Sequence, residues 1–340
     1  MISEMKKIRK TGRGTARRLG SGFALALSCL ASGTLAIADE PTELKFGGSA
    51  TWLGQVPIMV AIDNGYFEEE GIKVEFVPIG SSYDRLSALT SGSIDFSNLG
   101  RVAVISEMAR GNDAFYNVAN VDDSPGNEGC WARPGVETIA DMRGRKVAAN
   151  SSAEITMTLL LATEDMTQSD VELFNIGGTE MAPALARGDV DVACIWQPLL
   201  DGLKAAVPDG RLIGTDKDTS FYDEFGTMAA PDIVIMSRAL VNDSPEIANK
   251  VIKALFKGAD FANNNPEEAA QVVSHYFNKD AADLIDSIDK FMYFGGADWE
   301  AHIELHSGQM QALANLLYDL GKIGAKPDVT EWTNTDFITD

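Results

Sequence analysis

The sequence predicts an α/β protein made of two similar lobes, each built around a sheet with parallel strands. Val60–Arg101 reads as helix, strand, helix, strand, and this alternation is typical of parallel sheets. The pattern A-L-x-x-G-x-[IV]-D-apolar occurs at Ala88–Phe96 and again at Ala184–Val192. The segments expected as the preceding strands, Lys45–Ser49 and Lys146–Asn150, are also alike. We therefore expect two related α/β units.

The elements of the first unit follow from the chain in order. Ile72–Val77 alternates apolar and polar residues and reads as a strand. Ser81 or Ser82 is placed to cap the helix that follows, and Ile94–Leu99 is the next strand. Ligands of open parallel sheets bind at the carboxyl ends of the strands, so Arg101, just after this strand, is a candidate site residue.

The last hundred residues are predicted to be mainly helical. Apolar residues recur there at spacings of three and four, and prolines stand where two of the helices begin. We expect these helices to cover the first lobe. They are Pro245–Asn263, Pro266–Tyr276, Lys279–Ser287 and Trp299–Leu320.

Residues 1–38 read as a secretory signal peptide. Seven lysines and arginines between residues 6 and 18 precede an apolar run, Phe23–Ile37, and Ala36-Ile37-Ala38 fits a small-x-small cleavage site. The surroundings of Cys29 match a lipobox poorly, so we expect cleavage without lipid attachment. The sequence therefore predicts a protein that is exported from the cytoplasm.

The charge of the mature chain excludes some partners. Removing residues 1–38 leaves 21 basic and 49 acidic residues, a net charge of −28 against −22 for the full chain. Binding to nucleic acid depends on a basic surface that neutralises phosphates. We therefore predict no nucleic-acid partner and no binding to anionic membrane surfaces.

Two cysteines, Cys130 and Cys194, remain in the mature chain. In an oxidising compartment such a pair predicts a disulfide. A loop of this length would contribute about 4 kcal/mol in the chain-entropy model. The alternative is two buried free thiols.

Two helix starts are predicted to face the ligand. Backbone N–H groups at a helix start bind anions. The polar loop with Trp52 and Gln55 leads into the first such helix. Ser151 and Ser152 are placed to cap the second, and Glu154 follows in its first turn, where it either contacts a ligand or complements the helix dipole. Trp52 is either a ligand wall or ordinary packing between lobes.

The residues Asp63–Glu75 resemble a family signature, D-x-G-Y-F-x-x-E-G-L-x-V-E. It is the signature of periplasmic substrate-binding proteins for taurine, alkanesulfonates, nitrate and thiamine precursors. The resemblance continues through Ala88–Asp95, Ile139–Val147 and Ala184–Asp191 and covers essentially the whole mature chain.

The taurine-binding branch is the most similar part of this family. Asn98-Leu99-Gly100 and Ile195-Trp196-x-Pro198 carry that likeness. The chain departs from the branch at Arg101-Val102, where small hydroxyl residues are usual. This departure leaves the identity of the ligand open.

The resemblance implies a bilobal type II periplasmic-binding-protein fold, in which two lobes with mixed or parallel sheets are joined by two crossover strands. Breaker-rich segments place the crossovers at Asn127–Pro134 and Ala229–Met236. Lobe one would then comprise residues 43–130 and 232–340, and lobe two residues 131–231. The family also implies a monomer that docks on an ABC permease.

The sequence predicts neither an enzyme nor a metal site. It contains no G-x-S-x-G elbow, P-loop or H-E-x-x-H motif. His302 and His306 have the i, i+4 spacing of metal ligands, but Glu304 has the wrong offset for a metalloprotease. We therefore expect no catalytic residue, no metal and no cofactor.

The predicted function is an extracytoplasmic solute-binding protein of an ABC importer. A cleft between two lobes is the usual place for a small ligand, here a zwitterionic sulfonate such as taurine. The roles divide among ten side chains: Arg101, Ser151 and Ser152 for the sulfonate, Asp232, Glu128 and Glu154 for the ammonium, Trp52, Trp131 and Trp196 as walls, and Gln55 beside them.

Three alternatives stay open. The same class of receptor could take another small amine, a cation or a pyrimidine-like solute. A periplasmic sensor subunit that signals to a membrane kinase would have the same sequence features. Arg101 could instead form a salt bridge between the lobes.

Overall fold

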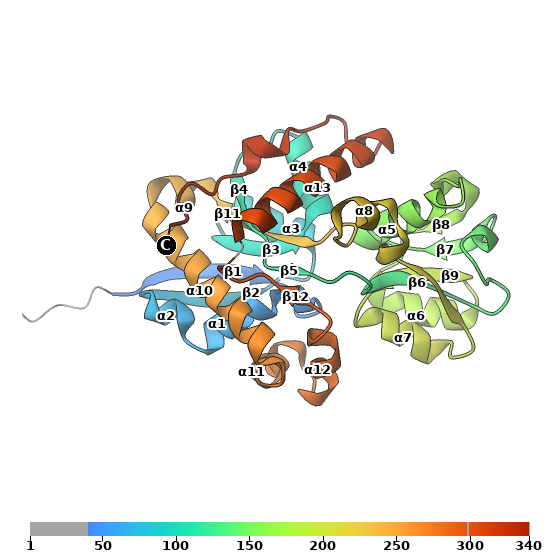
Figure 1. Ribbon diagram of the computed structural model, residues 1–340, viewed down its shortest axis with the longest axis horizontal. Helices are drawn as coiled ribbons and strands as arrows, with labels where there is room; N and C mark the ends of the chain where they lie inside the picture. Colours follow the sequence, from blue (N-terminus) through green and yellow to red (C-terminus); the bar gives the residue numbers. More distant parts are fainter. Residues whose placement is uncertain (1–39, 298, 340) are drawn as a thin grey trace, which may run out of the picture. The chain divides into compact units, whose positions relative to one another are not determined.

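The computed structural model describes residues 40–297 and 299–339, without the side chains of Ser151 and Ser152. The predicted signal peptide therefore lies outside the described residues. Within them the chain forms two five-stranded sheets and a two-stranded sheet (Figure 1). Residues 40–340 make up one compact unit.

The first sheet has the strand order β2-β1-β3-β11-β4. β1, β2 and β3 are parallel, and β11 runs antiparallel between β3 and β4. The strands are β1 (Thr42–Gly48), β2 (Ile72–Pro78), β3 (Phe96–Gly100), β4 (Phe115–Ala119) and β11 (Asp232–Ser237).

The second sheet has the order β10-β6-β9-β7-β8. β7 is parallel to β8 and β9, whereas β6 is antiparallel to β9 and β10. Its strands are β6 (Glu128–Ala132), β7 (Lys146–Ala148), β8 (Glu172–Phe174), β9 (Val192–Trp196) and β10 (Arg211–Thr215). The two-stranded sheet pairs β5 (Asp122–Asp123) with β12 (Met292–Tyr293).

These sheets confirm the predicted fold class, because both are mixed α/β sheets. The segments predicted as crossovers contain β6, which joins the second sheet, and β11, which joins the first. The first sheet takes its strands from residues 42–119 and 232–237, and the second from residues 128–215. The exact division into lobes stays a prediction.

Helices cover both faces of each sheet. On the first sheet, α1 and α10 pack on one face and α3, α4 and α13 on the other (Figure 1). These helices are α1 (Val56–Asp63), α3 (Ser82–Thr90), α4 (Arg101–Ala109), α10 (Pro245–Asn264) and α13 (Trp299–Asp319). α2 (Tyr66–Glu69), α9 (Arg238–Asp243), α11 (Pro266–Phe277) and α12 (Ala282–Ile288) are their neighbours in the chain.

On the second sheet, α5 packs on one face and α6 and α7 on the other. The helices are α5 (Ser151–Ala162), α6 (Gly178–Arg187) and α7 (Leu199–Ala206), with α8 (Ser220–Phe225) following β10. Short 3-10 helices lie at Leu53–Gln55, Ala140–Met142, Gln168–Asp170, Asp216–Asp218 and Val329–Trp332.

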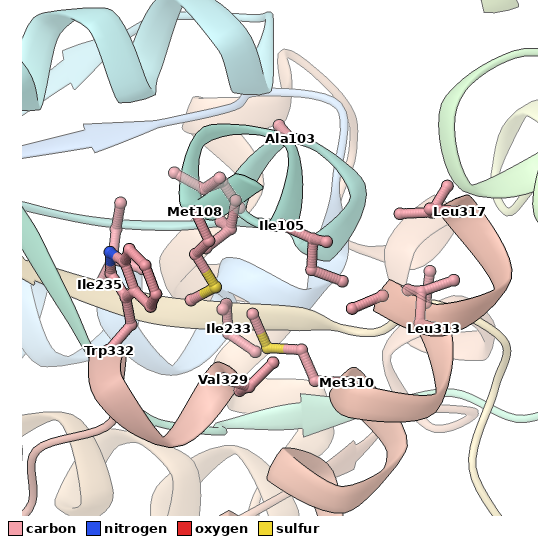
Figure 2. Packing of buried hydrophobic residues seen from close by; sticks show 14 of the residues in the cluster. Ala103, Ile105, Met108, Ile233, Ile235, Met310, Leu313, Leu317, Val329 and Trp332 are labelled. Atoms are coloured by element: carbon pink, nitrogen blue, oxygen red, sulfur yellow. The ribbon is translucent and has the colours of Figure 1, made fainter. Parts of the chain in front are cut away.

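One core cluster fixes the strand ends where ligands are expected. Figure 2 shows Met310 and Leu313 of α13 packing with Ile105 of α4 and Ile233 of β11. Burying each such side chain contributes about 2 kcal/mol. Because α4 follows β3 directly, this cluster holds the end of β3 and the start of β11 in place.

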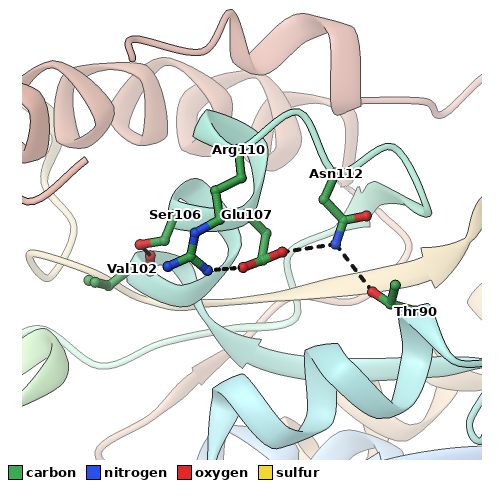
Figure 3. Close-up of polar contacts among 6 residues, drawn as sticks. All are labelled: Thr90, Val102, Ser106, Glu107, Arg110 and Asn112. Atoms are coloured by element: carbon green, nitrogen blue, oxygen red, sulfur yellow. Dashed lines mark hydrogen bonds and ion pairs between the residues drawn. The ribbon is translucent and has the colours of Figure 1, made fainter. Parts of the chain in front are cut away.

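Polar contacts join the far ends of α3 and α4. Figure 3 shows Asn112 donating from Nδ2 to Thr90 Oγ1 at 3.2 Å and to Glu107 Oε2 at 3.0 Å. Glu107 also pairs with Arg110. The two helices, whose first turns reach the candidate site, are thus held together at their other ends.

The predicted disulfide is confirmed. Cys130 and Cys194 are bonded, at a sequence separation of 64. They lie opposite each other on β6 and β9.

Among residues 40–297 and 299–339, no helix is long and apolar enough to span a membrane.

Candidate functional site

A cavity of about 730 Å³ is lined by residues from both large sheets. From the first sheet come the loops after β1 and β2, the end of β3, and the starts of α3 and β11. From the second come residues after β7 and β8 and the last residue of β9. The polar and aromatic residues among them are Ser49, Thr51, Trp52, Ser81, Ser82, Tyr83, Arg85, Ser106, Asn150, Glu154, Asn175, Trp196, Asp232 and Lys322.

Four residues predicted from the sequence line this cavity: Trp52, Glu154, Trp196 and Asp232. Ser151 and Ser152 begin α5, but their side chains lie outside the described residues. The other four predicted residues are placed elsewhere, and each for an identifiable reason.

Gln55 is fully buried, and its side-chain amide is hydrogen-bonded to backbone groups. Its Oε1 accepts the N–H of Ser49 at 2.6 Å, and its Nε2 donates to the carbonyl of Asn98 at 2.8 Å. Gln55 therefore ties the loop after β1 to β3, and shapes the cavity without lining it.

Arg101 begins α4 at the end of β3, where it was expected, but its side chain points into the core. It is fully buried, and it donates to the carbonyl of His306 at 3.3 Å and to the side chain of Gln309. Burial lowers the pKa of Arg101 to about 10, an effect that Asp123 opposes. The described structure thus places the guanidinium away from a ligand in the cavity.

Glu128 and Trp131 lie on β6 and do not line the cavity either. Glu128 is fully buried opposite Trp196. The indole Nε1 of Trp131 donates to the carbonyl of Val207 at 3.0 Å, which turns the ring toward the α7 face of the second sheet.

Arg85 is a cavity residue that the sequence did not single out. It lies one turn into α3, and only 3% of it is exposed. Its guanidinium donates to the carbonyls of Ile79 at 2.7 Å and Gly80 at 3.1 Å, and to the hydroxyl of Ser82 at 3.1 Å. A signal existed, because an arginine in the first turns of a helix that follows a parallel strand lies at the ligand edge of the sheet.

Asp232 presents a carboxylate to the cavity. It is the first residue of β11 and lies opposite Gly100; a Cβ on Gly100 would stand 3.5 Å from its Oδ1. Burial raises the pKa of Asp232 to about 6, and Arg85 and Arg101 oppose that rise. A buried carboxylate that opens only toward a cavity favours a cationic partner.

Aromatic rings form one wall of the cavity. Trp52 and Trp196 meet edge to face, with ring centroids 6.4 Å apart. On its other side Trp52 meets Phe291 at 5.2 Å, also edge to face. Since Trp52 follows β1 and Trp196 ends β9, the wall is built from both sheets.

An ion pair also crosses the cavity. Lys322, just after α13, donates to Glu154 of α5 at 2.6 Å. The same Oε1 of Glu154 accepts from Gln168 at 2.9 Å.

In the described part of the chain, His, Cys, Asp and Glu form no group of three that could hold a metal ion.

Helix starts converge on the cavity. Asn150 precedes α5, and Gly177 precedes α6; neither supplies a side-chain cap. The first N–H groups of a helix lack partners within the helix and bind anions. The first-sheet side of the cavity therefore has the carboxylate of Asp232 together with Arg85. The second-sheet side has the N–H donors of the helix starts, together with Glu154, which pairs with Lys322.

Two mixed sheets with a polar, aromatic-walled cavity at their strand ends have the arrangement of a substrate-binding protein with a site for a small solute. The chain belongs to the NMT1/THI5-like family, whose model matches residues 53–269. A binding protein of Brucella abortus strain 2308 is 24% identical over 330 residues, 95% of this chain and 99% of that relative. The taurine-binding periplasmic protein of Escherichia coli K12 is 25% identical over 203 residues, 58% of each chain.

Solved structures share the fold. The periplasmic aliphatic sulphonate binding protein SsuA from Escherichia coli has a TM-score of 0.72 at 18% identity, covering 88% of this chain and 94% of that chain. The desulfurization enzyme DSZB has a TM-score of 0.62 at 15% identity, covering 87% and 97%. The fold therefore occurs in both binding proteins and an enzyme.

Proposed function

We propose that this protein is the periplasmic solute-binding subunit of an ABC importer, and that it carries a small zwitterion such as taurine to a membrane permease. The cavity is the observation that supports this proposal, because it offers a negative group and anion-binding N–H groups on opposite sides. The solute's ammonium group would bind Asp232. Its sulfonate would bind the helix starts at α5 and α6.

Binding at both sides also explains how such a protein would respond to its solute. A ligand shifts a conformational equilibrium only by its different affinity for the two states. Asp232 belongs to β11 of the first sheet, and the helix starts belong to the second. A zwitterion would therefore favour the arrangement in which both groups reach it.

The experiment is a thermal shift with three small molecules. A solute that binds only the folded protein raises the melting temperature. Taurine carries both charges, isethionate lacks the amine, and choline lacks the anion. We expect taurine to give the largest rise.

Asp232→Asn tests which group meets the amine. A hydrogen bond to a charged group contributes about 2 kcal/mol, so the variant should bind taurine about thirtyfold more weakly. Asp189→Asn, on an exposed carboxylate paired with Arg187, is the control and should leave binding unchanged. Equal affinity of Asp232→Asn and the parent chain would contradict the proposal.

A cationic or pyrimidine-like solute is the second candidate. Two observations favour it: Arg101 lies outside the cavity, and Trp52 and Trp196 offer aromatic faces to a cation or a flat ring. A rise in melting temperature with choline or a thiamine pyrimidine, but not with taurine, would select this candidate and keep the transport role.

We also infer that the protein does no chemistry on its solute. The curated relatives named above are binding proteins, which supports this inference. Mass analysis of the solute after incubation with the protein should return it unchanged. A new product would show that the chain is closer in function to the enzyme that shares its fold.

A further inference from the structure

The aromatic wall of the cavity has a buried donor behind it. The indole Nε1 of Trp52 is enclosed by protein and makes no hydrogen bond within the described residues. Trp52 itself is 9% exposed, and this exposed part faces the cavity. An indole nitrogen can only donate, and buried indole N–H groups usually have a partner. The orientation of the ring therefore depends on what lies next to this atom.

A buried acceptor is also left over nearby. Asp122 of β5 is fully buried, and its Oδ1 accepts from Asn98 Nδ2 at 3.3 Å. Its Oδ2 has no hydrogen-bond partner in the part of the chain that the structure describes. A carboxylate oxygen without a partner in a protein interior destabilises the folded state.

Gly54 shows that these two atoms are neighbours. A Cβ built on Gly54 would stand 2.3 Å from Asp122 Oδ2 and 2.4 Å from Trp52 Nε1. The two atoms thus flank a single point that any other residue would fill with carbon. Gly54 lies in the 3-10 helix Leu53–Gln55, whose Leu53 carbonyl accepts the hydroxyl of Tyr293 at 3.1 Å.

We propose that Asp122 is the positioning residue for Trp52: a small rotation of either side chain closes the gap at Gly54, so that Oδ2 accepts the indole N–H and sets the angle of the ring that faces the solute. Asp122 does not touch the solute and acts only through Trp52. Gly54 is required because a side chain there would separate donor from acceptor. The effect on solute binding rests on the proposed function; the hydrogen bond itself does not.

The surroundings explain why this angle matters. Trp52 packs edge to face between Trp196 and Phe291, so a tilt of its ring changes both contacts. Trp196 belongs to the second sheet, and Trp52 follows the first. Fixing Trp52 from behind therefore fixes the shape of the wall at the point where the two sheets meet.

The first test observes the hydrogen bond without any solute. The indole N–H signals of a 15N-labelled protein are recorded, and the Trp52 signal is identified by its absence from Trp52→Phe. Asp122→Asn keeps the acceptor for Asn98 and places an NH₂ group against the indole donor. We expect the Trp52 signal to move upfield and its exchange with solvent to become about tenfold faster.

Asp123→Asn is the matched control. Asp123 is the next residue on the same strand and is equally buried, but its Oδ1 accepts from the N–H groups of Ser124 and Met228. This variant should leave the Trp52 signal in place. A signal that moves equally in both variants, or in neither, would overturn the inference.

The second test measures taurine binding in a double-mutant cycle. Asp122→Asn should weaken binding about tenfold in the parent chain and less than about twofold in Trp52→Phe, because the pair acts as a unit. Equal losses in both backgrounds would overturn the positioning role. If the parent chain does not bind taurine, the assignment of taurine as the solute fails, while the NMR result still decides the hydrogen bond.

A wild-type titration covers the case in which Asp122→Asn does not fold. Burial raises the pKa of Asp122 well above its usual range; Asp232 and Asp123 add to the rise, and Arg101 opposes it. Protonation weakens a carboxylate as an acceptor, so the Trp52 signal should move upfield as the pH falls. The same titration in Asp123→Asn should give the same movement at a lower pH, because Asp123 no longer adds to the rise. A Trp52 signal that does not change with pH would contradict the proposal.

Discussion

The first and second sheets contain the same unit of helix end, glycine, aspartate and strand. In the first, Gly92 has φ +73° and Asp95 Oδ2 accepts the N–H of Lys45 at 2.7 Å. In the second, Gly188 has φ +78° and Asp191 Oδ2 accepts the N–H of Lys146 at 3.1 Å. In both, the aspartate joins the start of its strand to the neighbouring parallel strand.

The two sheets differ in what stabilises them. The first is enclosed by long helices, among them α10 with 20 residues and α13 with 21. The second is enclosed by helices of 8 to 12 residues, and the Cys130–Cys194 disulfide joins two of its strands. The same local unit therefore occurs in one sheet that long helices cover and in another that has shorter helices and a covalent link between its strands.

The largest effect is expected when the Cys130–Cys194 disulfide is removed. Replacing both Cys130 and Cys194 with alanine should lower the free energy of unfolding by about 4 kcal/mol, because the unfolded chain regains the freedom of a 64-residue loop. Denaturant unfolding measures this. Reductant should destabilise the parent chain by a similar amount and leave the double variant unchanged; a double variant as stable as the parent would show that the second sheet does not depend on the bond.

The next effect concerns the entry to the second sheet. Asp216 accepts the N–H groups of Gly126 at 3.0 Å and Glu128 at 3.2 Å, just where β6 begins. Burial raises its pKa from 3.8 to about 6. The folded protein therefore holds this proton at a pH where the unfolded chain has lost it, and stability falls as the pH rises from about 4 through about 6.

Asp216→Asn keeps an oxygen acceptor but cannot ionise. The loss of stability between pH 4 and pH 8 should therefore be about 2 kcal/mol smaller in this variant than in the parent chain. Unfolding measured across that range tests it, with the exposed Asp209→Asn as control. Parallel pH profiles for Asp216→Asn and the parent would refute the assignment.

A smaller effect tests the repeated unit itself. Asp95→Ala and Asp191→Ala each remove one side-chain acceptor from a backbone N–H, so each should cost about 1 kcal/mol. Asparagine at either position keeps the acceptor and should recover most of the loss. Losses that differ by more than about 1 kcal/mol would show that the two copies are alike in sequence but not in energetic role.

The smallest effect concerns the ion pair across the cavity. Lys322 and Glu154 are 40% and 16% exposed in their side chains, and such pairs contribute about 0.5 kcal/mol or less. Lys322→Ala should lower stability by that amount in low salt and by nothing measurable at about 1 M salt. Lys326→Ala, whose pair with Asp319 lies within the α13 region, is the control for a bond that does not link the two sheets.

Local signals were sufficient to predict much of the fold. Proline and apolar spacing predicted Pro245–Asn263, and α10 is Pro245–Asn264. The strand expected at Ile94–Leu99 begins two residues later, at Phe96, because Asp95 is held by Lys45 as part of the turn. The cysteine pair could be predicted because only one pairing was possible in the mature chain.

The site was harder to predict because the direction of a side chain depends on distant partners. Arg101 stands at the expected strand end, but its acceptors on α13 come more than 200 residues later. Arg85 lines the cavity because the carbonyls of Ile79 and Gly80 receive its guanidinium, and no periodicity reveals such acceptors. The position of Asp232 could be predicted because it begins a strand in a predicted crossover segment, and such a strand start lies at the cavity.

The antiparallel direction of β11 has a consequence for how proteins with this fold can change their solute specificity. Because β11 enters the first sheet at the edge where β3 ends, Asp232 meets Gly100 although 131 residues separate them in the chain. The ends of β3 and β9 and the start of β11 thus line the cavity from one rim of each sheet, together with residues of α4, α5 and the segment after α13. The repeated glycine–aspartate units lie at the other ends of β3 and β9. Substitutions in those units can change stability without touching the cavity, whereas a few substitutions at the shared rim are enough to give a new specificity.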